Sequence, residues 1–236
     1  MAKDNVNSMA DLCQYIREGR IDESKRIVDS DRLILKKTDD AGRCVLHHAA
    51  VAGLLPLVHI SIQEEGVEAD TVDDMGWTAL MCASSAGKVD VLRFLIALPE
   101  VNLSKQNSNG QTALHYAASK GHEEIVSLLI ENGAEVNMRD KYGATALHRA
   151  ASQGRLKIVT LILKAKGVKV DIKDCEGKTP LYLSIEEGSE ECAVALVLHS
   201  ANLDEVDNDG KSCRSLVKSR TFVEKLKAAE MRSKGE

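Results

Sequence analysis

Apolar residues in this chain recur with a helical period, in short blocks separated by glycines and polar turns. Residues 112–133 read TALHYAASKGHEEIVSLLIENG, with a block of small residues before Gly121 and a block of bulky residues after it. Positions three and four apart share one face of a helix, so each block predicts an amphipathic helix. The central glycine suits the left-handed residue that ends a helix. The stretch therefore predicts two short antiparallel helices.

The same arrangement recurs along the chain. The turn pattern Asp/Asn-x-x-Gly begins at residues 39, 73, 107, 140, 174 and 207, which gives a period of 33 or 34 residues. A second glycine stands eleven residues after each of the first five turn glycines, at Gly53, Gly87, Gly121, Gly154 and Gly188. A unit of two helices cannot bury its apolar face alone, so copies must stack on one another. We predict an all-α solenoid of helix–turn–helix units with β-hairpin tips.

The residues of the fourth unit explain how each unit folds. Asn107 and Gly110 suit a tight turn, and Thr112 can cap the next helix by accepting a backbone N–H. A face of small residues then lets a neighbouring helix approach closely; it comprises Ala113, Leu114, Ala117 and Ala118. The second helix supplies bulk through Ile125, Val126, Leu128, Leu129 and Ile130.

We predict one domain over residues 1–236, built from seven repeats. The first and last repeats lack parts of the pattern and carry polar residues where a neighbour would pack, so we expect both to be caps. The expected boundaries are 5–38 for the N-terminal cap, then 39–72, 73–106, 107–139, 140–173, 174–206, and 207–236 for the C-terminal cap.

Composition agrees with a helical intracellular protein. Aromatic residues make up only 3% of the chain, so its core must be built from Leu, Ile, Val and Ala. The six cysteines show no CxxC or zinc-finger spacing, and we expect reduced, mostly buried thiols. The apolar runs are too short to cross a bilayer, so we expect no membrane partner.

Charge is unevenly distributed. Residues 211–236 hold eight Lys or Arg and three Glu, on a chain whose formal net charge is −5. A basic tail on an acidic body can indicate nucleic-acid binding. The same tail also has the pattern of an amphipathic helix, with Phe222, Val223, Leu226 and Ala229 on one stripe. We favour the helix and expect no nucleic-acid partner.

Catalytic and metal-binding patterns are weak. No H-E-x-x-H, G-x-S-x-G or phosphate-loop sequence occurs. His47, His115 and His148 share one repeat position, which favours a structural role over metal binding. Adjacent carboxylates could serve acid–base chemistry, but a solvated surface pair explains them as well; these pairs are Asp73-Asp74, Glu123-Glu124, Glu186-Glu187 and Glu190-Glu191. We predict no catalytic residue, no metal and no cofactor, and a binding function.

The period and the T-P-L-H-like starts resemble the ankyrin repeat; they read TALM (78–81), TALH (112–115), TALH (145–148) and TPLY (179–182). The resemblance implies that the imidazoles at the shared repeat position bond the backbone of adjacent turns. It also implies that hairpin tips and inner helices line one binding groove. Mixed charge along that groove favours a folded protein partner over a phosphate backbone. Trp77, the sole tryptophan, either packs on a neighbouring hairpin or anchors the partner.

Longer segments are similar to the gankyrin family, seven-repeat ankyrin proteins that act as assembly chaperones of the proteasome regulatory particle. These segments read DDMGWTAL, LHYAASK, DKYGATALHRAASQGRLKIV and KDCEGKTPL. The resemblance implies a groove that clamps the C-terminal domain of one AAA ATPase subunit, and a protein found in cytoplasm and nucleus. It places charged contacts at Arg43, Asp74, Lys120 and Glu187, with Trp77, Tyr116 and Arg149 at matching positions beside them. Together with residues expected along the same groove, the predicted protein-binding residues are Asp40, Arg43, Asp73, Asp74, Trp77, Tyr116, Lys120, Arg149, Glu186 and Glu187.

This sequence differs from the gankyrin family at two places, which limits how many of the family's contact residues can be assigned to it. One acidic contact of that family corresponds to Ala41, beside Asp39 and Asp40. The Leu-x-Cys-x-Glu sequence linked to retinoblastoma-protein binding in the vertebrate member reads Leu-Ser-Ile-Glu-Glu at 183–187. A second hypothesis is a different ankyrin adaptor or inhibitor that binds a kinase or a transcription factor, because a fold alone fixes no partner. With both ends capped, we expect a monomer when the protein is free.

Overall fold

The computed structural model describes residues 8–234, which contain fourteen α-helices, one 3-10 turn, one π-helical turn and no strand. These residues form two compact units, one ending at Asn109 and one beginning at Gly110. The predicted all-α repeat solenoid is confirmed. Single β-bridges, Thr38 to Cys44 and Val206 to Ser212, are the whole β content of the described hairpins. The prediction of a single domain over 1–236 stays a prediction.

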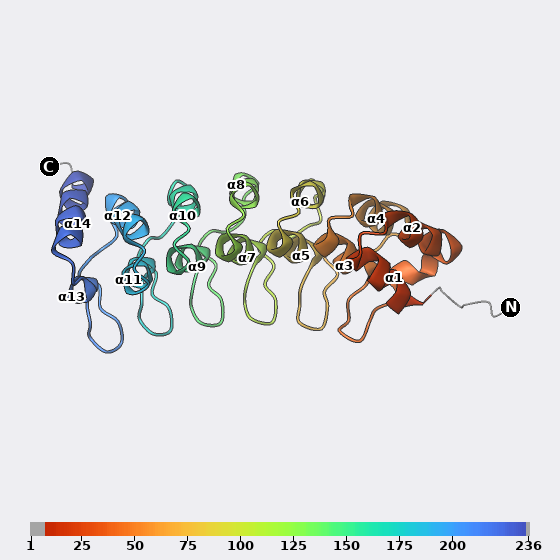
Figure 1. Cartoon of the computed structure of the whole chain (residues 1–236), viewed down its shortest axis with the longest axis horizontal. Helices are drawn as coiled ribbons and strands as arrows, with labels where there is room; N and C mark the ends of the chain where they lie inside the picture. The colour runs from red at the N-terminus through yellow and green to blue at the C-terminus, as the bar shows by residue number, and fades with distance from the viewer. Residues whose placement is uncertain (1–7, 235–236) are drawn as a thin grey trace. The chain divides into compact units, whose positions relative to one another are not determined.

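The N-terminal unit begins with the predicted cap and continues with two full repeats. Residues 5–7 of the expected cap boundary lie outside the described range. The elements of this unit are α1 (Met9–Arg17), α2 (Ile21–Ser30), η1 (Arg32–Lys36), α3 (Val45–Ala52), α4 (Leu55–His59), η2 (Ile60–Glu64), α5 (Ala79–Ala86) and α6 (Val89–Ile96). The first helix of each pair lies in an inner row and the second in an outer row (Figure 1).

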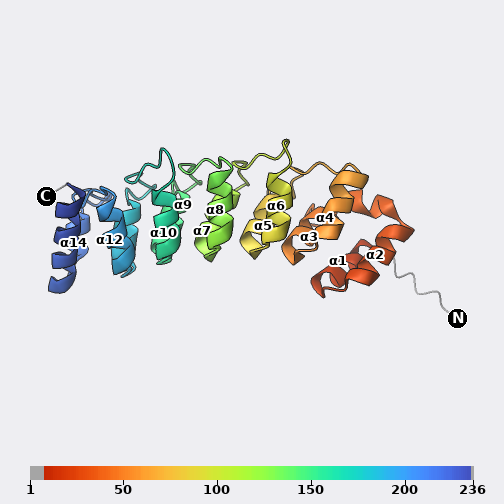
Figure 2. The same ribbon diagram turned by 90° about the horizontal axis from the view of Figure 1, so that it is seen from above.

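The C-terminal unit contains three full repeats and the second cap. Its elements are α7 (Ala113–Lys120), α8 (Glu123–Glu131), α9 (Ala146–Ser152), α10 (Leu156–Leu163), α11 (Pro180–Glu186), α12 (Glu190–Leu198), α13 (Cys213–Leu216) and α14 (Arg220–Ser233). Inner helices α7, α9 and α11 pack in sequence, as do outer helices α8, α10 and α12. From above, α10, α12 and α14 run side by side (Figure 2).

Local structure in the repeats follows the sequence. The small-residue face of α7 is at most 1% exposed, which lets neighbouring inner helices approach closely. Gly121 ends α7 with φ at +90°, the left-handed conformation that favours glycine. In the C-terminal cap the inner helix α13 spans only four residues, and α14 buries Phe222, Leu226 and Ala229 as expected. Val223 is half-buried.

The side chain of the first Asp or Asn holds the turn of each hairpin, and it is buried at Asp73, Asn107, Asp140 and Asp207. Asp73 Oδ1 accepts the backbone N–H groups of Met75 and Trp77 at 2.9 and 2.8 Å, and Asp140 and Asp174 bond the same two positions of their own turns. The side-chain oxygen of the turn residue therefore accepts backbone N–H groups that would otherwise need the carbonyls of a neighbouring strand. This is why the pattern Asp/Asn-x-x-Gly repeats with the period of the chain.

An imidazole joins each of three inner helices to the next hairpin. His115 Nδ1 accepts the Thr112 backbone N–H at 3.1 Å, and its Nε2–H donates to the Ala144 carbonyl at 3.1 Å. His148 makes the same pair of bonds with Thr145 and Lys178. Because a carbonyl can only accept, these rings carry their proton on Nε2. The expected structural role of the histidines is confirmed.

Burial keeps these imidazoles neutral. His148 is fully buried, and burial lowers its pKa from the ordinary 6.5 to about 4. Burial also lowers the pKa of His47 and His115. Between pH 6.5 and 4 the unfolded chain binds more protons at His148 than the folded chain does, so the stability contributed by this residue is lost as the pH falls.

Acidification should therefore destabilise the protein through His148. We expect His148 alone to remove about 3 kcal/mol of unfolding free energy between pH 6.5 and 4. Urea denaturation followed by circular dichroism at several pH values would measure this. His148→Gln should flatten the pH dependence, whereas replacement of the exposed His199 by Gln should preserve it. An unchanged slope in His148→Gln would contradict the buried neutral ring.

Neighbouring aspartates in the second hairpin should differ in their effect on stability. Asp73 holds two backbone N–H groups and the Arg43 side chain, whereas the Asp74 side chain is exposed. Asp73→Ala should lower the unfolding free energy by about 2–3 kcal/mol, since it leaves these donors without an acceptor. Asp74→Ala, the matched control, should change it by less than about 0.5 kcal/mol. Urea titration of both variants compares them directly, and equal losses would refute the assignment.

Candidate functional site

The N-terminal unit carries five of the ten predicted binding residues. Arg43 Nε donates to Asp73 Oδ2 at 2.9 Å; the Arg43 side chain is 38% exposed and the Asp73 side chain only 1%. Asp73 therefore lies beneath the surface and cannot meet a partner with its carboxylate. It holds Arg43 in place instead, and the remaining N–H groups of the guanidinium stay available at the surface.

Asp40, Asp74 and Trp77 lie near this pair. Asp40 and Asp74 are exposed, and neither side chain has an ion pair within residues 8–234. Trp77 is half-buried, and its carbonyl accepts the Nε2–H of His47 at 2.9 Å. Its backbone thus supports the hairpin, and part of its side chain reaches the surface. Packing on a neighbouring hairpin and anchoring of a partner both stay predictions for Trp77.

The C-terminal unit repeats the same division of roles. Arg149 pairs with Asp140, whose side chain is fully buried, while the Arg149 side chain is 32% exposed. Lys178 Nζ donates to both oxygens of Glu186 at 3.0 and 2.9 Å, and this bond holds the pKa of Lys178 above its usual range. Arg149 and Glu186 are therefore fixed by internal partners.

Lys120 and Glu187 differ from those residues. Lys120 is the last residue of α7, and Glu187 caps the end of α11. Both side chains are exposed, and neither forms an ion pair in the described part of the chain. Tyr116 lies on α7, one turn before Lys120, and is half-buried. In each unit the structure thus presents some charges that are held internally and some that lack an internal partner.

Sequence reasoning missed the residues that bind the second carboxylate oxygen of the hairpins. Asp39 Oδ2 lies 2.8 Å from His48 Nε2, and Tyr182 donates its hydroxyl to Asp207 Oδ2 at 2.6 Å. Burial and Asp207 together raise the pKa of Tyr182 to about 12. The sequence spacing could have indicated His48 and Arg149 as partners, since each stands nine residues after the aspartate of its own hairpin. For Tyr182 the partner comes from the next repeat, and no spacing rule indicated it.

The buried thiols are poor nucleophiles. Burial raises the pKa of Cys82 to about 12 and those of Cys13 and Cys213 to about 11, so these side chains stay protonated at neutral pH. Cys175 alone is exposed, in a hairpin. Across residues 8–234 no group of three or more His, Cys, Asp or Glu could hold a metal ion. No described helix has the length and apolarity that a bilayer span requires.

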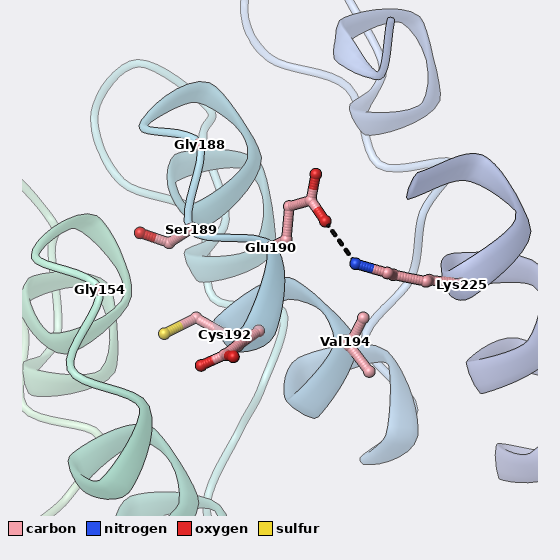
Figure 3. A pocket seen from close by; sticks show the side chains of 8 residues that line it. Gly154, Gly188, Ser189, Glu190, Cys192, Val194 and Lys225 are labelled. Atoms are coloured by element: carbon pink, nitrogen blue, oxygen red, sulfur yellow. Dashed lines mark hydrogen bonds and ion pairs between the residues drawn. The ribbon is translucent and has the colours of Figure 1, made fainter. Parts of the chain in front are cut away.

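A cleft of about 630 Å³ lies in the C-terminal unit, beside α12 and α14 (Figure 3). Glu190 on α12 and Lys225 on α14 face each other across it and form an ion pair of 2.9 Å. The thiol of Cys192 borders the cleft, but burial raises its pKa. The adjacent carboxylates Glu190 and Glu191 thus belong to an ion-paired, open surface, and the nearby groups provide no base and nucleophile in contact.

The arrangement suits recognition of another protein surface. Charges of both signs stand on rigid hairpins and helix ends, where electrostatic complementarity can select a partner. Exposed apolar side chains accompany them at two tips, Met75 (51% exposed) and Tyr142 (68% exposed). Acidic and basic residues alternate along these hairpins and helix ends. They therefore do not form the continuous basic stripe that binds a phosphate backbone.

Comparisons with known proteins agree with this picture. Residues 12–105 and 97–174 match the family described as Ankyrin repeats (3 copies), and residues 176–208 match the family described as Ankyrin repeat. None of the curated proteins matches the chain. Among solved structures, the ankyrin repeat domain of Bcl-3, described as a unique member of the IkappaB protein family, is similar with a TM-score of 0.78 and 25% identity. That alignment covers 92% of this chain and 97% of the Bcl-3 domain.

These matches extend over most of the sequence, and the paired helices and hairpins agree with them. Ankyrin repeats are protein-interaction scaffolds, and neither matched family is catalytic. The comparisons do not support gankyrin specifically, so membership of the gankyrin family stays a hypothesis. The chain belongs to the ankyrin-repeat family of protein-binding repeat proteins.

Proposed function

We propose that this protein is an assembly chaperone of the proteasome regulatory particle, which clamps the C-terminal domain of one AAA ATPase subunit. The observation that carries the proposal is the set of exposed charges without an internal ion pair, at hairpin and inner-helix positions: Asp40, Asp74, Lys120 and Glu187. An exposed charge is easily solvated and needs no partner for folding. Charges in these positions are therefore available for a second protein.

The gankyrin resemblance selects nearly the same residues. It places charged contacts at Arg43, Asp74, Lys120 and Glu187. Three of these have no intramolecular ion pair among residues 8–234, and Arg43 keeps part of its guanidinium exposed while Asp73 orients it. Tyr116 and Arg149 lie at matching positions and are partly exposed. The contact positions of the gankyrin family thus coincide with exposed charges of this chain that lack an ion pair. This coincidence supports the proposed partner.

The mechanism is steric and electrostatic. A bound ATPase domain would be kept from docking prematurely on the core particle, without any chemical step by this chain. Charge complementarity would choose one ATPase subunit over the others, because unmatched charges at a protein interface are costly. We accordingly propose that the protein has no enzymatic activity and no cofactor, is monomeric when free, and resides in the cytoplasm and nucleus.

A second candidate is an adaptor or inhibitor in signalling that binds a kinase or a transcription factor. The similarity to the ankyrin domain of Bcl-3, an IkappaB-family member, favours this alternative. The two candidates share the binding surface and differ in the partner. Titration with isolated ATPase domains therefore distinguishes them.

We expect one of the six ATPase C-terminal domains of the host proteasome to bind the full chain with 1:1 stoichiometry in isothermal titration calorimetry. Asp74→Lys, Lys120→Glu and Glu187→Lys should each weaken binding about tenfold, which is about 1.4 kcal/mol. Raising the salt concentration should also weaken it, since exposed charges are screened.

Lys36→Glu provides the matched control, because Lys36 is exposed on η1 and outside the proposed surface. Its affinity should equal that of the wild-type chain. None of these variants should change the unfolding free energy by more than about 0.5 kcal/mol. Absence of binding to all six domains would refute the proteasome assignment and leave the signalling adaptor as the better candidate.

A further inference from the structure

A cleft of about 440 Å³ lies in the N-terminal unit, between α1, α3 and the turn that leads into α6. Basic side chains line it: Arg17 from α1, Arg43 and His48 from the second repeat, and Lys88 from the third. Apolar atoms complete the lining through Ile16, Val51 and Ala52. Sequence reasoning did not bring these residues together, because they come from three different repeats.

Two of the four basic side chains lack an internal anion. Arg43 is bound to Asp73, and His48 to Asp39. Arg17 and Lys88 form no ion pair with any residue from 8 to 234. The residues that line the cleft include no carboxylate, so its lining carries an excess of positive charge.

Lys88 occupies a position that helix electrostatics do not favour. It is the N-cap residue of α6, where backbone N–H groups create a positive potential and a carboxylate or hydroxyl would stabilise the helix. Its stem passes over Gly53: a Cβ there would stand 2.9 Å from Lys88 Cδ, so glycine leaves room for the stem. Gly53 also has φ at +81°, which disfavours a side chain.

The floor of the cleft is apolar. Ile16 is 1% exposed and packs in the core, whereas Val51, a residue of the last turn of α3, is 45% exposed. Exposed aliphatic surface beside cations suits a ligand with a negative group and an adjoining apolar group. A free phosphate would satisfy the cations but leave Val51 uncovered.

We propose that this cleft binds a segment of a protein partner in which a Glu or Asp side chain adjoins an aliphatic side chain. The carboxylate is placed between Arg17 and Lys88, and the aliphatic group packs on Val51. Arg43, oriented by Asp73, supplies further N–H donors at the same site. The proposal rests on the protein-binding function, and it does not depend on which protein is the partner.

The test uses two helix-forming peptides, acetylated and amidated, that present a Leu between two Glu on one face, or the same Leu between two Gln. Each is titrated into the ¹⁵N-labelled full chain and followed by amide chemical shifts. The Glu peptide should shift the amides of Arg17, Val51, Ala52 and Lys88 and bind at least tenfold more tightly than the Gln peptide. The double variant Arg17→Gln/Lys88→Gln should lose this preference.

Lys164→Gln/Lys166→Gln is the matched control, because both lysines are exposed on a loop of the other unit and form no ion pair within the described residues. It should bind both peptides as the wild-type chain does. Equal binding of the Glu and Gln peptides, shifts confined to other residues, or an unchanged preference in Arg17→Gln/Lys88→Gln would overturn the proposal. Inorganic phosphate producing the same shifts as the Glu peptide at equal concentration would also overturn it.

These results are independent of the proteasome assignment. Failure of the peptide titration with successful binding of an ATPase domain would reject the cleft and retain the chaperone. Successful peptide binding without any ATPase binding would retain the cleft as a general acidic-segment site and reject the chaperone.

Discussion

The polar bonds that join inner helices α3, α7 and α9 to the following hairpins, and those within each hairpin turn, are the constraint on which both units depend. A helix pair of about thirty residues cannot bury its apolar face alone, and a hairpin without strand neighbours cannot satisfy its own backbone. The imidazoles of His47, His115 and His148 bridge the start of one helix and a carbonyl of the next hairpin. The hairpin aspartates satisfy the turns from within. Stacking is thus fixed by directional bonds as well as by apolar contact, and the hairpins project as rigid elements.

The periodic features were predictable because each follows from a residue's own neighbours. The helix pairs and the left-handed glycines could be inferred from spacing alone, and the shared position of three histidines indicated a common structural role. The partners of Asp73 and Asp207 could not be inferred in the same way, since Arg43 and Tyr182 come from adjacent repeats. Burial also decides what a charge can do: Asp73 and Asp74 look alike in sequence, yet the first lies inside a hairpin and the second faces solvent.

This difference has a functional consequence. Charges that the fold needs are buried or paired, as with Asp73, Asp140 and Glu186. Charges that the fold does not need stand exposed at tips and helix ends, as with Asp74, Lys120 and Glu187. The first set orients side chains such as Arg43 and Arg149, and the second can be matched by a partner at little cost in folding. Rigid presentation lowers the conformational entropy lost on binding, so such a surface can be selective without a deep pocket.

We propose that hairpin tips and inner-helix ends form the binding surface, while the outer helices support it. Amide hydrogen exchange of the full chain, measured with and without the ATPase domain that binds it, separates these two roles. We expect slower exchange in the segments around Asp74, Lys120 and Glu187, with no change along the outer helices α8, α10 and α12. Protection confined to those outer helices, with none in the hairpins, would contradict it.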